Sequence, residues 1–207
     1  MGLRAQAHPL SEIVPLGWHM PAGAFDGILA GSANAFRQGG PLLGELTGQP
    51  VYAVGASTAE AAGKSGFRVA VTGKGGLQTV LDELAGQRLR LLRIAGEDHV
   101  PLDPPAGVTM ATVIAYRVAA LPVSPDLAFS LERGAVVLLH SASAAEHFAA
   151  EVDRLGLARC AIRLAALGER IAAAAGPGWA SVSAADEPND PALLALAREL
   201  CHEPLRG

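Results

Sequence analysis

Lysine, cysteine and aromatic residues are scarce in this 207-residue sequence. Lys64 and Lys74 are its only lysines, and 20 acidic residues outnumber 16 basic ones, which gives a formal charge of −4. This balance excludes the basic surface with which proteins usually bind nucleic acid. Two cysteines are too few for the disulfide framework of a small secreted domain, so we expect a cytoplasmic protein.

The sequence also lacks long apolar runs. No segment reaches the roughly 20 apolar residues that a helix needs to cross a bilayer, and residues 1–10 lack the apolar stretch of a signal peptide. The six histidines form neither an H-E-x-x-H motif nor a cluster with cysteine. We therefore expect no membrane partner and no metal site.

Half of the residues are apolar, and they form short β-type runs that alternate with alanine-rich helical runs. The β-type runs are residues 26–30, 51–54, 68–71 and 90–94 in the first half, and residues 135–139, 161–166 and 180–183 in the second. Strands without polar positions are typical of parallel sheets that helices cover on both faces. The second half repeats the pattern of the first, which predicts an α/β protein with two similar parallel-sheet domains.

Two further β-type runs, residues 11–16 and 112–119, lie at the junctions between these halves. We interpret them as paired extended linkers, a two-stranded connection that fixes which faces of the domains meet. Tyr116 lies in the second run and is one of only two tyrosines. Its phenol, with a reference pKa of about 10, can donate a proton while uncharged at neutral pH. Simple packing of this ring on the linker is the alternative.

Hydroxyl side chains stand at the predicted junctions between strands and helices. Ser32 and Ser141 follow strands, and Ser57 and Ser143 each precede a glutamate by three residues, as in a capping box. One interpretation is that these hydroxyls only cap helices. The other is functional, because helix N-termini gather at the carboxyl edge of a parallel sheet, where their free amides bind anions. Two such edges facing each other would hold a polyanion without many lysines.

A series of short segments resembles the uroporphyrinogen-III synthase family. The segments are residues 25–35 (FDGILAGSANA), 51–59 (VYAVGASTA), 113–117 (VIAYR), 137–144 (VLLHSASA), 167–168 (LG) and 185–188 (ADEP). They occur in the family's order, and the resemblance runs from about His8 to about Leu200.

The resemblance implies two α/β domains joined by a two-stranded β-ladder, with the active site in the cleft between them. The expected parts are a discontinuous domain of residues 1–12 and 124–207, an inserted domain of residues 19–110, and linker strands at residues 13–18 and 111–123. The family usually begins with a strand ending in Thr-Arg-Pro and then a helix. Neither has a counterpart here, so we expect the discontinuous domain to lack them.

The resemblance also implies a hydro-lyase of tetrapyrrole (haem) biosynthesis that works as a monomer without metal or organic cofactor. Its substrate would be hydroxymethylbilane, a linear tetrapyrrole with eight carboxylates. The reaction removes the terminal hydroxyl as water and closes the ring to uroporphyrinogen III, with inversion of the last pyrrole. Tyr116 matches the family's tyrosine and would assist departure of the hydroxyl.

The substrate-binding residues expected from the resemblance are Ser32, Ala33, Ser57, Thr58, Ser141, Ala142 and Arg170. Many family members carry a threonine after the glycine of the last glycine-ended strand. This sequence has Glu169 there, and Arg170 could supply a charge in place of the lost hydroxyl. A non-catalytic two-domain protein that binds an anionic small molecule is the alternative function.

Overall fold

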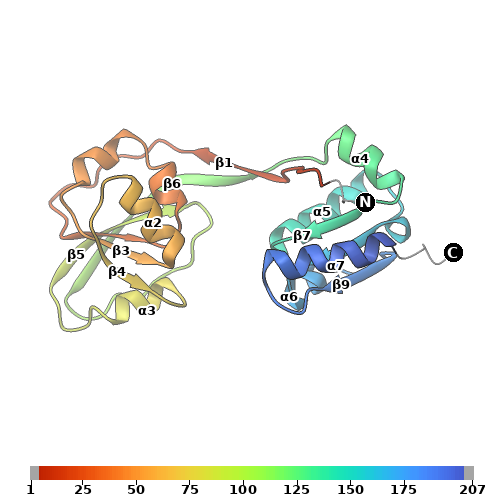
Figure 1. The fold of residues 1–207 in the computed structure, drawn as a ribbon. Helices are drawn as coiled ribbons and strands as arrows, with labels where there is room; N and C mark the ends of the chain where they lie inside the picture. The colour runs from red at the N-terminus through yellow and green to blue at the C-terminus, as the bar shows by residue number, and fades with distance from the viewer. Residues whose placement is uncertain (1–4, 203–207) are drawn as a thin grey trace. The chain divides into compact units, whose positions relative to one another are not determined.

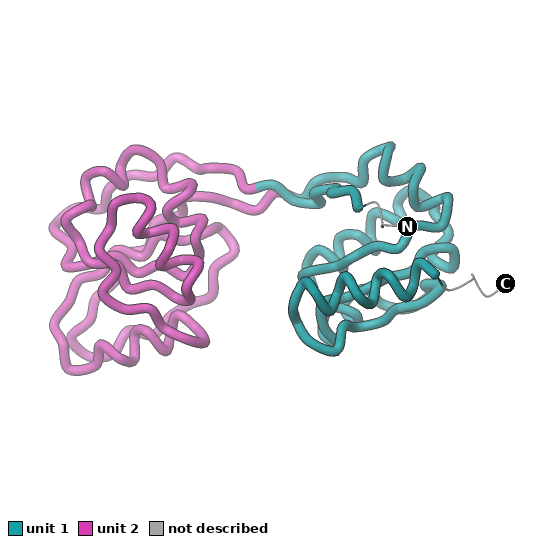
Figure 2. The backbone as a smooth tube through the Cα atoms, in the orientation of Figure 1, with its two compact units in different colours: residues 1–12, 120–207 teal, residues 13–119 magenta. Residues whose placement is uncertain are grey.

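The computed structural model describes residues 5–202, and the chain divides into two compact units (Figure 2). Unit 1 comprises residues 1–12 and 120–207, and unit 2 comprises residues 13–119. The chain leaves unit 1 within strand β1 (Ser11–Pro15) and returns to it at the end of strand β6 (Val108–Ala120).

Strands β1 and β6 are hydrogen-bonded neighbours. The Leu16 N–H donates to the Ala115 carbonyl (2.8 Å), and the Leu121 N–H donates to the Leu10 carbonyl (2.9 Å). Because the numbering falls along one strand as it rises along the other, the pair is antiparallel.

Unit 2 contains a six-stranded sheet in the order β1-β6-β5-β2-β3-β4 (Figure 1). Its remaining elements are β2 (Gly27–Ala30), α1 (Asn34–Arg37), the 3₁₀ helix η1 (Pro41–Leu46), β3 (Val51–Val54), α2 (Ala56–Lys64), β4 (Val69–Gly73), α3 (Leu77–Asp82) and β5 (Leu89–Gly96). All strand pairs from β6 to β4 are parallel. After β2 the next two strands, β3 and β4, are added on one side of β2, and then β5 and β6 are added on its other side. The boundary between β2 and β5 is therefore a topological switch point.

Alternate residues of β2 pack into different apolar clusters, which explains why the strand has no polar position. Ile28 and Ala30 pack with residues of α1 and α2, whereas Leu29 packs with residues of α3. All three are fully buried. The predicted α/β class with parallel sheets is confirmed.

Unit 1 contains a second, three-stranded parallel sheet in the order β7-β8-β9. Its elements are α4 (Pro125–Glu132), β7 (Val136–Leu139), α5 (Ala142–Arg154), the 3₁₀ helix η2 (Arg159–Ala161), β8 (Arg163–Ala166), α6 (Glu169–Ala174), β9 (Ser181–Ala184) and α7 (Asp190–His202). Leu164 of β8 packs with residues of α5 and α6, whereas Ala165 packs with residues of α7. Helices therefore cover both faces of this sheet as well.

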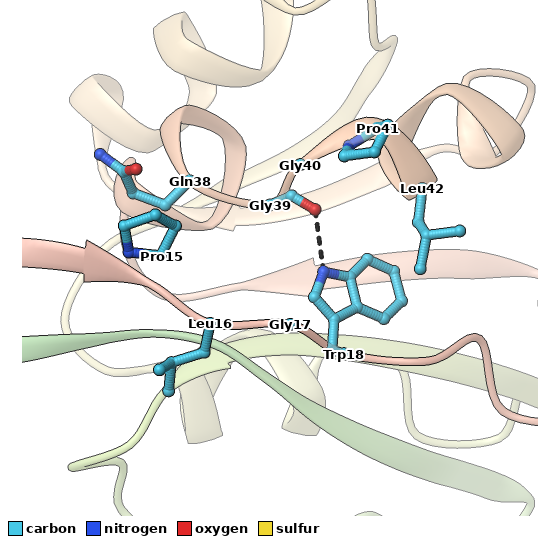
Figure 3. Close-up of a pocket in the computed structure, with 9 residues that line it drawn as sticks. All are labelled: Pro15, Leu16, Gly17, Trp18, Gln38, Gly39, Gly40, Pro41 and Leu42. Atoms are coloured by element: carbon cyan, nitrogen blue, oxygen red, sulfur yellow. Dashed lines mark hydrogen bonds between the residues drawn. The ribbon is translucent and has the colours of Figure 1, made fainter.

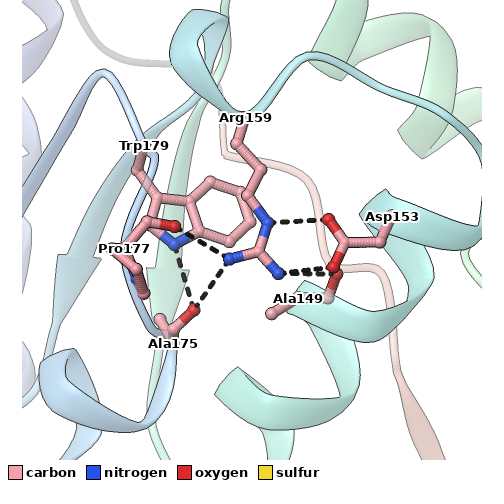
Figure 4. A network of polar contacts seen from close by, with 6 residues as sticks. All are labelled: Ala149, Asp153, Arg159, Ala175, Pro177 and Trp179. Carbon is pink, nitrogen blue, oxygen red and sulfur yellow. Dashed lines mark hydrogen bonds and ion pairs between the residues drawn. The ribbon is translucent and has the colours of Figure 1, made fainter.

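Arg159 connects α5 to the loop that precedes β9 (Figure 4). Its Nε and Nη2 donate to the two carboxylate oxygens of Asp153 (2.8 and 2.7 Å), and its Nη1 donates to the Pro177 carbonyl (2.9 Å). The guanidinium also lies 4.7 Å from the ring centre of Trp179. These contacts hold the end of α5 and the segment before the edge strand in one arrangement.

Glu151 of α5 holds the segment that enters unit 1 after β6. Its Oε2 accepts a hydrogen bond from the Val123 N–H (2.9 Å), and both carboxylate oxygens accept from Arg154 (2.7 Å each). One turn earlier, the ring of His147 lies 2.7 Å from the Leu121 carbonyl. The hydrogen bonds from Arg154, which have the larger effect, and the one from Val123 lower the pKa of Glu151 from 4.5 to about 2.

This lowered pKa predicts an acid-sensitive contribution to the stability of unit 1. Because the folded state binds the Glu151 proton less readily than the unfolded state, the contribution is complete above about pH 5 and is lost as pH falls toward about 2. We expect urea unfolding to show wild type more stable than Glu151→Gln at pH 7, with the difference shrinking below pH 5. A difference that is constant from pH 7 to pH 3 would contradict the assignment.

Candidate functional site

The carboxyl edge of the unit 2 sheet collects the predicted site residues of that unit. Ser32 follows β2, Ser57 and Thr58 lie in the first turn of α2 after β3, and Tyr116 of β6 pairs with Gly96, the last residue of β5. The carboxyl ends of parallel strands lie at the same edge of a sheet, so these residues all lie along that carboxyl edge. The switch point between β2 and β5 lies among them.

The predicted hydroxyls at this edge differ in their surroundings. The Ser32 Oγ accepts a hydrogen bond from the Asn34 N–H (3.2 Å), so it supports the start of α1, beside the buried Ala33. Ser57 is exposed, whereas Thr58 is 2% exposed. Of these three hydroxyls, that of Thr58 is therefore the least available to a ligand from solvent.

The predicted capping boxes are wrong. Helix α2 begins one residue before Ser57, and Gly55 occupies its N-cap with a positive φ of 76°, a conformation that glycine favours. In α5 the cap is Ser141, whose Oγ accepts from the Ala144 N–H (3.2 Å), and Ser143 lies inside the helix. Glu60 and Glu146 have the capping-box spacing from Ser57 and Ser143, but neither serine is an N-cap. Each helix begins one residue before the serine, and the sequence does not show that starting point.

The carboxyl edge of the unit 1 sheet carries the remaining predicted residues. Ser141 and Ala142 follow β7 at the start of α5, and the exposed Arg170 lies in the first turn of α6 after β8. The His140 Nε2 lies 3.4 Å from the Asp190 carboxylate at the start of α7. The edge thus offers a hydroxyl, the free amides of a helix start and one cation. The predicted cleft between the two domains stays a prediction.

Tyr116 is held in place by packing on Gly96. A Cβ atom on Gly96 would lie 2.7 Å from Cε2, 2.9 Å from Cζ and 3.2 Å from the hydroxyl oxygen of Tyr116. The outer end of the ring therefore lies close to a backbone that has no side chain at this point, and the residue is 8% exposed. The absence of a side chain at position 96 lets the phenol lie at the sheet edge.

This packing predicts that Gly96→Ala impairs function without unfolding unit 2. The added methyl would displace the end of the Tyr116 ring, and a misplacement of about 1 Å at a reacting group can cost up to about 10²-fold in rate. We expect kcat to fall about tenfold. Gly44→Ala is the matched control, because its Cβ would meet nothing within 4 Å and should leave kcat unchanged. Equal kcat values for the two variants would disprove the positional role of Gly96.

Sequence reasoning missed one buried polar residue of β5. Arg93 of β5 is 5% exposed and pairs in register with Leu29 of β2, which packs with residues of α3. Burial lowers the pKa of Arg93. Nothing in the sequence distinguishes Arg93 from Arg90 of the same strand, which is only partly buried.

A pocket of about 420 Å³ lies elsewhere in unit 2, where the chain after β1 passes the loop between α1 and η1 (Figure 3). Trp18 lines it, and its indole Nε1 donates to the Gly39 carbonyl (2.8 Å). Among the residues that line the pocket, none is charged and none is a predicted site residue. It therefore lacks the side-chain cations that pair with carboxylates.

Residues 5–202 contain neither a membrane-spanning helix nor a metal-binding cluster. No helix there is long and apolar enough to cross a membrane. No group of three or more histidine, cysteine, aspartate or glutamate side chains is arranged to hold a metal ion in that part of the chain.

Of the two similar solved structures described here, the first supports the fold. The crystal structure of uroporphyrinogen-III synthetase from Helicobacter pylori 26695 matches with a TM-score of 0.66 and 17% identity, over 92% of this chain and 91% of that chain. A mutant uroporphyrinogen III synthase from the extremely thermophilic bacterium Thermus thermophilus gives a TM-score of 0.47 and 22% identity, over 86% of this chain and 79% of that chain.

Comparison of the sequence with the curated proteins finds no match. In contrast, the family model described as uroporphyrinogen-III synthase HemD matches residues 1–195. This match covers nearly the whole chain, including both sheets and all the predicted site residues. The chain therefore belongs to the uroporphyrinogen-III synthase family.

Proposed function

We propose that this chain catalyses the dehydrating cyclisation of hydroxymethylbilane to uroporphyrinogen III, with inversion of the last pyrrole ring. The family match supports this activity. The observation that carries the proposal is the phenol of Tyr116, held against Gly96 at the carboxyl edge of a parallel sheet. This edge, next to a topological switch point, is where open α/β sheets bind ligands.

Tyr116 acts in this proposal as the proton donor to the departing hydroxyl. Loss of hydroxide from the bilane is difficult, and donation of a hydrogen bond or proton lets it leave as water. Tyr116 is 8% exposed and packs among apolar residues, so most of its ring is shielded from solvent. The remaining task is to hold a flexible chain in the one conformation that closes with inversion, which is a matter of positioning.

The polar groups at the two sheet edges are proposed to bind the substrate carboxylates. In unit 2 these are Ser32, Ser57 and the free first-turn amides of α2. In unit 1 they are Ser141 and Arg170, with the first-turn amides of α5. Backbone amides and a few hydroxyls suit a polycarboxylate in a chain with only two lysines.

A coupled assay tests the function directly. Porphobilinogen and a hydroxymethylbilane synthase supply the linear substrate, and the products are oxidised and separated by isomer. The bilane closes without inversion when no cyclising enzyme is present, so that reaction gives the type I isomer. We expect the added chain to give the type III isomer. Type I product alone would reject the proposal and leave the non-catalytic binding protein as the alternative.

We also propose that the protein works as a monomer in the cytoplasm. Both cysteines, Cys160 and Cys201, are free and exposed, which suits a compartment that keeps thiols reduced. Sedimentation at increasing concentration tests the monomer, and fractionation of the source cells tests the compartment.

A further inference from the structure

The pocket that Trp18 lines adjoins the position of Tyr116. Strands β1 and β6 are antiparallel, and the Leu16 N–H donates to the Ala115 carbonyl. The residue before Leu16 therefore lies opposite the residue after Ala115, which makes Pro15 and Tyr116 a facing pair. Residues directly opposite each other have side chains on the same face of the sheet, with Cβ atoms about 4.5–5.5 Å apart. Pro15 lines the pocket, so the pocket begins beside the proposed proton donor.

The indole of Trp18 is held in one orientation at this pocket. Its Nε1 donates to the Gly39 carbonyl (2.8 Å), as Figure 3 shows. Part of the side chain packs against the apolar cluster that also contains Tyr116, and the residue as a whole is only partly buried. An aromatic ring fixed in this way can pack against another flat ring with little further loss of side-chain freedom.

A second wall of the pocket follows helix α1. It consists of residues 38–42, which lead from the end of α1 into η1. Ser32, at the carboxyl edge of the sheet, lies just before the other end of this helix. Since α1 has four residues and rises about 1.5 Å per residue, its two ends are only about 6 Å apart. The pocket therefore lies about one helical turn from Ser32.

The lining of the pocket is uncharged. It comprises leucine, proline, glycine, tryptophan and glutamine residues, and Gln38 supplies its remaining polar side chain because the indole N–H is bonded to Gly39. Such a lining would leave a carboxylate without a counter-charge, so it favours a neutral aromatic group. Its volume of about 420 Å³ lies within the range of about 300–1,000 Å³ found for small-molecule pockets.

We propose that this pocket receives one pyrrole ring of the substrate, with the ring packed on Trp18 and its carboxylate side chains outside the pocket. The inference rests on the proposed function for the identity of that substrate. A linear tetrapyrrole consists of uncharged aromatic rings that carry charged side chains, so it needs binding groups of two kinds. The amides and hydroxyls of the sheet edges bind carboxylates, and the pocket binds a ring. Fixing one ring next to Tyr116 restricts a flexible chain before it closes.

The first test needs no catalysis. The wild-type protein is labelled with 5-fluorotryptophan, and ¹⁹F NMR follows its two tryptophans, Trp18 and Trp179, as porphobilinogen is added. Porphobilinogen is a single pyrrole with two carboxylates, so it carries the ring that the pocket is proposed to bind. We expect the Trp18 signal to move until binding saturates, whereas the Trp179 signal, from the core of unit 1, stays in place. The signal that is lost in Trp18→Phe assigns the pair.

Sodium propionate at equal ionic strength is the control for the probe, because it supplies a carboxylate without a ring. It should move neither signal. A Trp18 signal that does not respond to porphobilinogen, or that responds equally to propionate, would overturn the proposal.

Gly17→Val tests the pocket itself. Gly17 lines the pocket, its φ lies outside the left-handed region, and a Cβ atom there would meet nothing within 4 Å. A larger side chain therefore fits without strain and takes up open space beside Trp18. We expect it to weaken porphobilinogen binding, measured at the Trp18 signal, about tenfold.

Gly48→Val is the matched control. Gly48 is exposed like Gly17 and has equally open space around its Cβ position, but it does not line the pocket. It should keep the wild-type affinity. Equal affinities in Gly17→Val and Gly48→Val would contradict binding of the ring in this pocket.

The second test uses turnover. We expect Gly17→Val to lower kcat/KM for the bilane about tenfold, mainly by raising KM, and Gly48→Val to match the wild type. An unchanged kcat/KM in Gly17→Val would remove the pocket from substrate binding. If the wild type forms no type III isomer but porphobilinogen still moves the Trp18 signal, the proposed function fails and the pyrrole pocket stands.

Discussion

Replacing Tyr116 by phenylalanine is expected to lower kcat for type III isomer formation by about 10²-fold, the low end of the range for a lost general acid. The substitution removes only the hydroxyl, and the ring can keep its position against Gly96. No hydrogen bond from this hydroxyl to another residue is found within residues 5–202, so its removal leaves no described group unpaired. The melting temperature should therefore change little.

Tyr52→Phe is the control that the chain itself offers. Tyr52 is the other tyrosine, lies on β3 of the same sheet, is 9% exposed and also packs against a glycine, Gly27. Its hydroxyl has no role in the proposed mechanism, so the variant should keep wild-type turnover. A Tyr116→Phe enzyme as fast as Tyr52→Phe would remove Tyr116 from the chemistry, whatever its effect on substrate binding.

Replacing Phe148 by alanine is expected to destabilise unit 1 by about 3–5 kcal/mol. Phe148 is fully buried, and its ring stacks on that of Trp179 with the centres 5.6 Å apart. Truncation to alanine leaves a cavity beneath α5 and removes the surface on which Trp179 rests. Since Arg159 lies over the same indole, the network that holds the loop before β9 should loosen as well.

Urea unfolding measures this loss, and Phe129→Ala is its control. Phe129 lies on α4 of the same unit but is 61% exposed, so its truncation should change the free energy of unfolding by no more than about 0.5 kcal/mol. Activity of Phe148→Ala should fall with stability, because α5 also carries Ser141 at its N-terminus. A loss of less than about 1 kcal/mol would show that the aromatic pair is not a core contact.

The sequence by itself determined the fold class and the family. An apolar run such as residues 51–54 is stable as a strand only where both of its faces are buried. The alternation of such runs with helical runs therefore predicts parallel sheets with helices on both faces, as observed. The same logic placed Ser32 just after a strand, whereas Tyr116 was expected in a linker strand; the structure has Tyr116 within β6, paired with the last residue of β5. Helix α4 was missed, although Ser124 and Pro125 are a common start for a helix.

Only the tertiary structure decided which polar groups are buried and what each one contacts. The N-cap of α2 is Gly55 and not the predicted Ser57. A helix begins where the backbone geometry allows it, and the positive φ of Gly55 lets α2 begin before Ser57. Arg93 is one arginine among many in the sequence, and its burial results from neighbours that are distant along the chain, Leu29 and Thr112. Burial and charge pairing are properties of three-dimensional neighbourhoods, which local sequence patterns do not encode.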